Sequence, residues 1–229
     1  MTAELTAPLF EPISVRGMTI PNRTVMAPMG RMFAKDHVPS PDAPAYYRRR
    51  VNGGVGLVIT EATGIDHPLS ADHGGTPHMH GEAALQAWRA VVQDVHQAGG
   101  LIVPQLFHQG MLHGGGTPDQ AVESLRPSGT IGTPGSTSFA PHYIERASVP
   151  TQTMTEGQIA DVIARFARSA RNAVALGFKS SNYDARTTRD PRELEAMGSA
   201  SDTLLARPAV LARLTTSASV SVALIGRST

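Results

Sequence analysis

The chain has 229 residues, a formal net charge of +1 and 17% charged residues. So weak a charge gives no surface that could neutralise many phosphates, so nucleic acids and anionic membranes are poor partners and a small molecule is the expected one. Cysteine is absent, which excludes disulfides, a Cys-ligated zinc site and a thiol nucleophile. The sequence has no run of about 18 apolar residues and no secretion signal at its start, so we expect a cytoplasmic protein.

Two short apolar runs and a helix between them open the chain. The first run covers residues 24–29, and the second, nearly continuous, covers residues 55–60. A continuous apolar run of this length is typical of a parallel strand that is covered on both faces. Between the runs, the pattern predicts a helix over residues 43–52 that is closed by Gly53 and Gly54. These segments together predict one strand–helix–strand unit.

A second helix and a third strand follow. Five apolar side chains recur at helical spacing before the pair Gly99-Gly100: Leu85, Trp88, Val91, Val92 and Val95. The next apolar run covers residues 101–107. Residues 114–150 are then rich in Gly, Pro and Ser, and this stretch is too long for an ordinary connector, which predicts a functional or flexible loop.

The last predicted helix carries the best start signal in the chain. Thr155 and Gln158 form a capping box, and an apolar stripe at helical spacing runs from there to Val174. The alternation of strands and helices up to this point is typical of a parallel α/β fold with right-handed crossovers. Periodicity alone does not separate a closed barrel from an open sheet.

The character of the sequence changes after Phe178. Tyr183 is the last aromatic residue, and no histidine follows His142. We therefore divide the chain into residues 1–178, which carry the α/β pattern, and a divergent tail of residues 179–229 that is frame-changed or disordered. No strand is predicted directly after the last helix, although residues 219–224 alternate as a strand does.

Four ordered blocks of sequence carry a resemblance to a known family. They cover residues 9–29, 53–62, 104–110 and 154–178. In these blocks the chain resembles the front half of the old yellow enzymes, the NADH:flavin oxidoreductase family that carries FMN on a (β/α)₈ barrel. The resemblance implies an α/β fold made of the first three to four βα units of a TIM barrel, opened by a short hairpin, with the C-terminal half missing.

The resemblance also implies a chemistry, in which hydride passes from NAD(P)H through FMN to an activated alkene such as an enone. Its flavin contacts match Pro28, Met29, Gly30, Ala62 and Gln105. This agrees with the residue types, because a glutamine amide both donates and accepts hydrogen bonds and small side chains leave room for a flat ring. The alternative for Met29 and Ala62 is ordinary strand packing.

The chain departs from the family at two places. Gly30 stands where the family usually has a Thr or Cys that hydrogen-bonds the flavin. Residues 179–184 read KSSNYD where the family has a His-x-x-His or His-x-x-Asn pair followed by a Tyr. We therefore assign no catalytic residue and expect a truncated, impaired enzyme, or alternatively an inactive barrel remnant or interaction fragment. Unpaired sheet edges would favour self-association.

Two groups of histidines are candidates for further sites. His78 and His80 have the spacing of a metal-binding pair, but loop histidines are more often solvated, so no metal is predicted. His108, near His113, could face a substrate cavity. A hydrogen-bonded structural role for His108 is equally compatible with the sequence.

Overall fold

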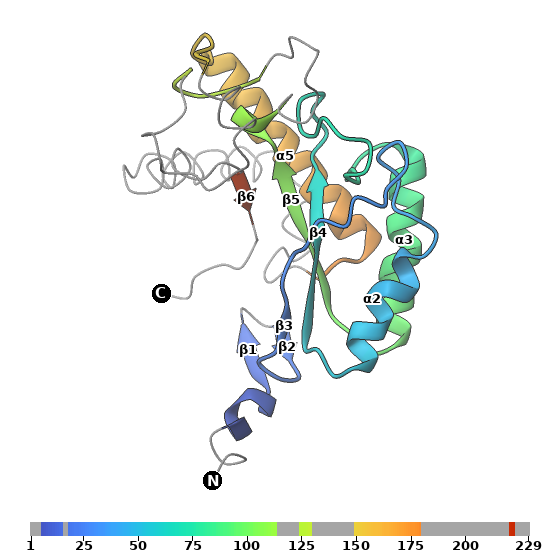
Figure 1. Cartoon of the computed structure of the whole chain (residues 1–229). Helices are drawn as coiled ribbons and strands as arrows, with labels where there is room; N and C mark the ends of the chain where they lie inside the picture. Colours follow the sequence, from blue (N-terminus) through green and yellow to red (C-terminus); the bar gives the residue numbers. More distant parts are fainter. Residues whose placement is uncertain (1–5, 16–17, 114–123, 130–148, 180–219, 223–229) are drawn as a thin grey trace.

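The structure is a computed structural model, and it describes residues 6–15, 18–113, 124–129, 149–179 and 220–222 (Figure 1). In chain order the elements are the 3₁₀ helix η1 (Ala7–Phe10), strands β1 (Ile13–Val15), β2 (Met18–Ile20) and β3 (Val25–Met26), helix α2 (Ala43–Asn52), strand β4 (Leu57–Gly64), helix α3 (Glu82–Gln97), strand β5 (Ile102–His108), the 3₁₀ helix η2 (Gly110–Leu112), helix α5 (Glu156–Leu176) and strand β6 (Val220–Val222). No helix within these residues is long and apolar enough to cross a membrane.

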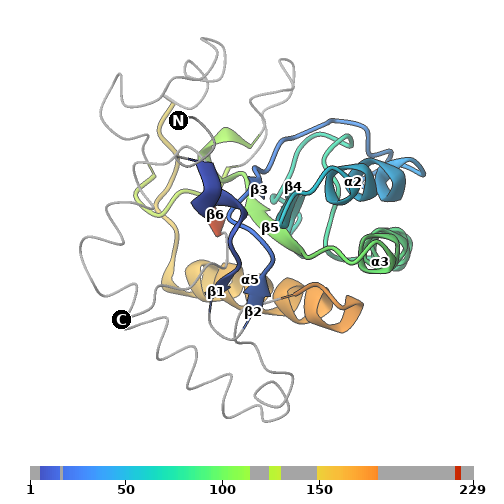
Figure 2. The ribbon, with the colours of Figure 1, turned by 90° about the horizontal axis from the view of Figure 1, so that it is seen from below.

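The main sheet has the order β3-β4-β5-β6, and its first three strands are parallel. Helices α2, α3 and α5 follow one another around one side of this sheet, as the view along the strands shows (Figure 2). Strands β1 and β2 form the expected antiparallel hairpin near the start of β3. The described residues therefore form an α/β fold of successive βα units, with the helices on the outer face.

The core lies between the sheet and the helices. Trp88 on α3 is fully buried, and its ring meets those of Tyr47 on α2 and Phe178 after α5 at centroid distances of 6.4 and 5.8 Å. Ile102 and Leu106 reach the same core from β5. Each fully buried large apolar side chain contributes about 1.5–3 kcal/mol to the stability of the fold. This core therefore holds the strands in the arrangement that positions a site at their ends.

The predicted helix over residues 43–52 is confirmed residue for residue, whereas the predicted strands shift. The first strand was predicted over residues 24–29 but its pairing ends at Met26. The reason is that Pro28 has no N–H for a ladder and the chain leaves the sheet before it. The second strand, predicted over residues 55–60, runs on to Gly64.

A bulge in β4 explains how a proline fits into the neighbouring strand. The register pairs Ile59 with Val103 and then Ala62 with Gln105, so two residues of β4 lie opposite Pro104 alone. Because Pro104 cannot donate to a ladder, the loss of regular pairing there costs little. The Gln105 N–H instead donates to the Thr60 hydroxyl at 3.1 Å.

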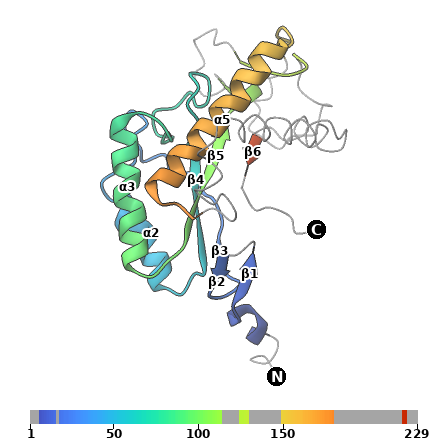
Figure 3. The ribbon, with the colours of Figure 1, turned by 180° about the vertical axis from the view of Figure 1, so that it is seen from behind.

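Helix α5 begins as its sequence predicts. The side chains of Thr155 and Gln158 form the complete capping box, and Gly177 closes the helix at φ 92°. Figure 3 shows α5 lying across β4 and β5. The chain then returns to the sheet, where the Lys179 N–H donates to the Ile102 carbonyl at 3.0 Å. This one backbone hydrogen bond joins the end of the described segment to β5, and no strand directly follows α5 within the described residues.

The free edge of β5 is partly covered, contrary to the expectation of an unpaired edge. Strand β6 pairs antiparallel with the last three residues of β5, Leu106 to His108. An edge strand offers unpaired N–H and C=O groups that any extended segment can satisfy, which is the physical reason for the correction. Residues 180–219 and 223–229 of the predicted tail, and most of the predicted loop over residues 114–150, lie outside the described residues.

Candidate functional site

Ala62 and Gln105, two of the five predicted flavin contacts, lie side by side. They are direct partners across β4 and β5. Along β5 the buried positions include Ile102 and Leu106, which pack on the helices, and Gln105 alternates with them. Gln105 therefore points to the face of the sheet away from the helices, which is the inner face of a βα barrel.

The amide of Gln105 is available to a ligand. Its backbone N–H bonds Thr60, but its side chain makes no hydrogen bond to any residue that the structure describes. The residue is half-buried, so the amide is not sealed inside the core. This amide has a free N–H donor and a free carbonyl acceptor. It can therefore pair with the edge of a ligand that carries an acceptor and a donor side by side.

The other three predicted contacts, Pro28, Met29 and Gly30, follow β3. Figure 1 shows this segment rising along β4 before the chain returns through α2. Met29 is 51% exposed, and a Cβ added to Gly30 would meet no atom within 4 Å. The segment therefore leaves room beside it, as a flat ligand requires.

A buried ion pair joins this segment to β4. Glu61 accepts hydrogen bonds from the Arg31 backbone N–H at 3.0 Å and from its Nε–H at 2.9 Å, and both side chains are at least 90% buried. Tyr47 closes the network, because its hydroxyl accepts from the Glu61 N–H at 3.1 Å and donates to the carboxylate at 3.4 Å. Burial, and then the charge of Glu61, raise the pKa of Tyr47, so the phenol keeps its proton.

Aromatic rings hold the guanidinium of Arg31 in place. It lies 4.1 Å from the centre of the Tyr46 ring and 5.4 Å from that of Tyr47, while Arg50 packs at 3.6 Å from the Tyr46 ring centre. Such contacts are favourable when the cation is desolvated. Sequence reasoning missed this network, since a single Arg and a single Glu thirty residues apart form no motif.

His108 lies on the buried side of β5, not beside Gln105. It is 4% exposed, its Nδ1 accepts from the Gly110 N–H at 3.0 Å, and its Nε2 faces Nδ1 of His67 at 3.1 Å. Burial, with His67 and His113 adding to it, lowers the pKa of His108 to about 3, so the ring is neutral at pH 7. Two occupied ring nitrogens favour the structural role over the substrate role.

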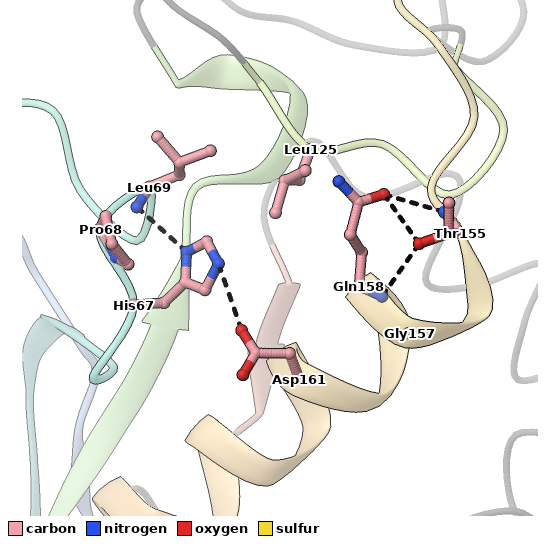
Figure 4. Close-up of a pocket in the computed structure, with 8 residues that line it drawn as sticks. All are labelled: His67, Pro68, Leu69, Leu125, Thr155, Gly157, Gln158 and Asp161. Carbon is pink, nitrogen blue, oxygen red and sulfur yellow. Dashed lines mark hydrogen bonds and ion pairs between the residues drawn. The ribbon is translucent and has the colours of Figure 1, made fainter.

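An open pocket of about 560 Å³ lies beyond His67, between the segment after β4 and the start of α5 (Figure 4). Nε2 of His67 points to the Asp161 carboxylate, 3.9 Å away, too far for a hydrogen bond. Burial lowers the pKa of His67, and Arg165 adds to the effect. No predicted site residue lines this pocket: its walls are His67, Pro68, Leu69, Leu125, Thr155, Gly157, Gln158 and Asp161.

His78 and His80, the residues with metal-pair spacing, do not converge on a common point. Their rings stack with centroids 4.4 Å apart and planes 22° apart. No group of three or more histidine or acidic side chains that could hold a metal ion is found in the described part of the chain. The position of the family's histidine pair, residues 179–184, is described only at Lys179.

Comparisons with known proteins bear on this arrangement. The sequence model of the NADH:flavin oxidoreductase / NADH oxidase family matches residues 8–180. The chain is 37% identical to a chanoclavine-I aldehyde reductase of Penicillium roqueforti and 34% identical to a probable flavin mononucleotide-dependent alkene reductase of Leishmania infantum, over 74% of this chain in both cases. It spans less than half the length of these curated relatives, 43% and 47%.

A solved structure gives the same result. The old yellow enzyme homologue of Zymomonas mobilis superimposes with a TM-score of 0.61 at 29% sequence identity, over 75% of this chain and 46% of the other. The residues that match the family model, 8–180, include β3, β4, β5 and α5.

Proposed function

Because the chain belongs to the NADH:flavin oxidoreductase / NADH oxidase family, we propose that it binds FMN at the ends of β3, β4 and β5 and accepts electrons from NAD(P)H. The observation that carries the proposal is the pairing of Ala62 with Gln105, whose amide is unpaired among the described residues. Bound FMN would supply hydride transfer to and from its ring. The residues of the chain would bind that ring and hold it in place.

Each predicted contact has a role in this proposal. The Gln105 amide would donate to and accept from the polar edge of the flavin ring. Ala62 and Gly30 would let the ring approach the backbone, since neither carries a bulky side chain and the space beside Gly30 is open. Pro28 and Met29 would complete the wall after β3.

We propose an activated alkene such as an enone as the oxidant that takes up hydride. The name of the Leishmania relative, a probable alkene reductase, supports the alkene. Reduction of this substrate would be slow. Residues 179–184 offer no histidine pair to stabilise negative charge on a carbonyl oxygen, and the loss of such donors typically costs about a hundred- to a thousandfold in rate. Glycine at position 30 also offers no side chain to tune the flavin. FMN binding and flavin reduction are therefore the activities to test first.

The test is a titration of the purified full chain with FMN, followed by absorbance and by quenching of flavin fluorescence. We expect saturable binding and bleaching of the bound flavin by NADPH or NADH without oxygen. Gln105→Leu should weaken binding by about tenfold or more, as expected when a buried ligand hydrogen bond is lost. Gln93→Leu, on the exposed face of α3, is the matched control and should bind as the parent does. Absence of any FMN uptake by the parent protein would refute the proposal.

A further inference from the structure

We propose that Arg31 and Glu61 are a positioning pair that fixes the two flavin-contacting segments relative to each other and keeps the charge beside the bound flavin balanced. The inference rests on the proposed function. Its starting point is a simple juxtaposition: Arg31 directly follows Gly30, and Glu61 directly precedes Ala62. One ion pair therefore joins the two segments at the positions next to Gly30 and Ala62.

The contacts between Arg31 and Glu61 hold the two segments in one orientation. The carboxylate of Glu61 takes both the backbone N–H and the Nε–H of Arg31, so it holds the main chain of the segment as well as the side chain. Two hydrogen bonds from one residue to both oxygens of a carboxylate set orientation as well as distance. Within the described residues, these are the hydrogen bonds that connect residues 28–31 to β4.

Glu61 can reach this position because of the bulge opposite Pro104. Thr60 and Glu61 together lie opposite Pro104, so β4 has one extra residue here and the regular alternation of its side chains is broken. Bulges re-aim a side chain in this way next to sites of function. The carboxylate then lies between Arg31 and Tyr47, whose hydroxyl also donates to it.

The charges of the pair would act on a flavin only when they are unbalanced. As a close ion pair, Arg31 and Glu61 nearly cancel at a distance. A flavin gains negative charge when it is reduced. Removal of the Glu61 charge would leave the guanidinium to favour the reduced flavin and raise its potential. Removal of the Arg31 charge would leave the carboxylate to oppose reduction and lower the potential.

The experiment measures FMN affinity and reduction potential for the full chain and for Glu61→Gln, Arg31→Met and the double variant. All three should bind FMN more weakly, by about ten- to a hundredfold, since a charge-assisted hydrogen bond no longer holds the segment. The potential should rise in Glu61→Gln and fall in Arg31→Met. In the double variant it should return toward that of the parent protein.

Two controls separate positioning from a general loss of structure. Arg48→Met removes another arginine–carboxylate pair, formed with Asp94 at 2.9 Å between α2 and α3, and should leave both affinity and potential unchanged. Arg31→Lys keeps the charge but not the bonding of Nε, so it should lower affinity with little change in potential. This milder variant also serves if Arg31→Met does not fold.

The outcomes distinguish the two proposals. If the parent protein takes up no FMN, the proposed function fails and the positioning role fails with it. If the parent binds FMN but the Glu61 and Arg31 variants share its affinity, or shift the potential in the same direction, only the positioning role is overturned.

Discussion

The imidazole rings of His37 and His78 lie face to face, with centroids 3.7 Å apart and planes within 9°. The His78 backbone N–H also donates to the His37 carbonyl at 2.9 Å. The segment after β3 is thus also attached to the segment after β4 beyond the Arg31–Glu61 pair. The ring of His80 also stacks against that of His78 and faces the carboxylate of Asp66 at 3.6 Å.

This stack predicts a loss of stability in acid. Burial lowers the pKa of His78 to about 3, with the neighbouring His37 and His80 adding to the shift and Asp66 opposing it. The unfolded chain binds a proton near the ordinary pKa of about 6.5, so it holds more protons than the folded chain between these values. Stability is therefore full above pH 6.5 and falls below it, by up to about 1.4 kcal/mol per pH unit for each such histidine.

Urea unfolding at pH 8, 6.5 and 5 measures this dependence. His78→Gln should unfold with a smaller change in free energy between pH 8 and pH 5 than the parent protein, because one buried titrating ring is gone. His108, whose pKa burial also lowers to about 3, should leave part of the acid dependence in place. Equal pH dependence in His78→Gln and the parent would contradict the prediction.

Trp88 should be the most costly single truncation in the core. It is fully buried between Tyr47 and Phe178, and its indole N–H donates to the His78 carbonyl at 3.1 Å. We expect Trp88→Ala to lower the free energy of unfolding by about 3–5 kcal/mol, from lost burial and the cavity left behind. Trp88→Phe keeps most of the packing and should cost less. Thermal or urea unfolding that ranks the two variants the other way would refute this reading.

The start of α5 offers a separate test of local structure. The Thr155 hydroxyl accepts from the Gln158 N–H at 3.2 Å, and the Gln158 side chain accepts from the Thr155 N–H at 2.9 Å. Thr155→Ala should cost about 1 kcal/mol, since it removes the cap. Thr153→Ala, two residues before the cap residue and exposed, is the control and should cost almost nothing. The free energies of unfolding of both variants decide the matter.

The elements that sequence predicted best are those fixed by local signals. Helix α2 and the cap of α5 follow from nearby glycine, threonine and glutamine residues, and the side-by-side placement of Ala62 and Gln105 follows from the ends of neighbouring parallel strands. The Arg31–Glu61 pair was not predictable in this way. Its partners are thirty residues apart, and the bulge that brings them together depends on which residue of β5 lies opposite.

The partners of β5 at its free edge were also not predictable from the sequence. Periodicity predicts that residues 101–107 are a strand, but not what covers its edge. The Lys179 N–H bonds the Ile102 carbonyl at one end, and β6 pairs antiparallel at the other. Backbone groups carry these contacts, so the side-chain pattern, which marks residues 219–224 as strand-like, does not say which strand they pair with.

The bulge itself can be tested through Thr60. This buried hydroxyl accepts from the Gln105 N–H at 3.1 Å and donates to the Glu61 carbonyl at 2.9 Å, so it serves as the acceptor for an N–H that would otherwise bond a backbone carbonyl. Thr60→Val has nearly the same shape but leaves a backbone N–H without an acceptor, which should cost about 1–3 kcal/mol. Thr63→Val is the matched control.

The control is informative because Thr63 donates to the same Glu61 carbonyl at 2.9 Å, and Thr60 still satisfies that carbonyl when Thr63 is replaced. Thr63→Val should therefore cost less than Thr60→Val in urea unfolding. Thr60→Val should also weaken FMN binding, because the Gln105 main chain loses the bond that fixes it, whereas Thr63→Val should not. Equal costs for the two variants would mean that the hydroxyl of Thr60 does not hold the bulge.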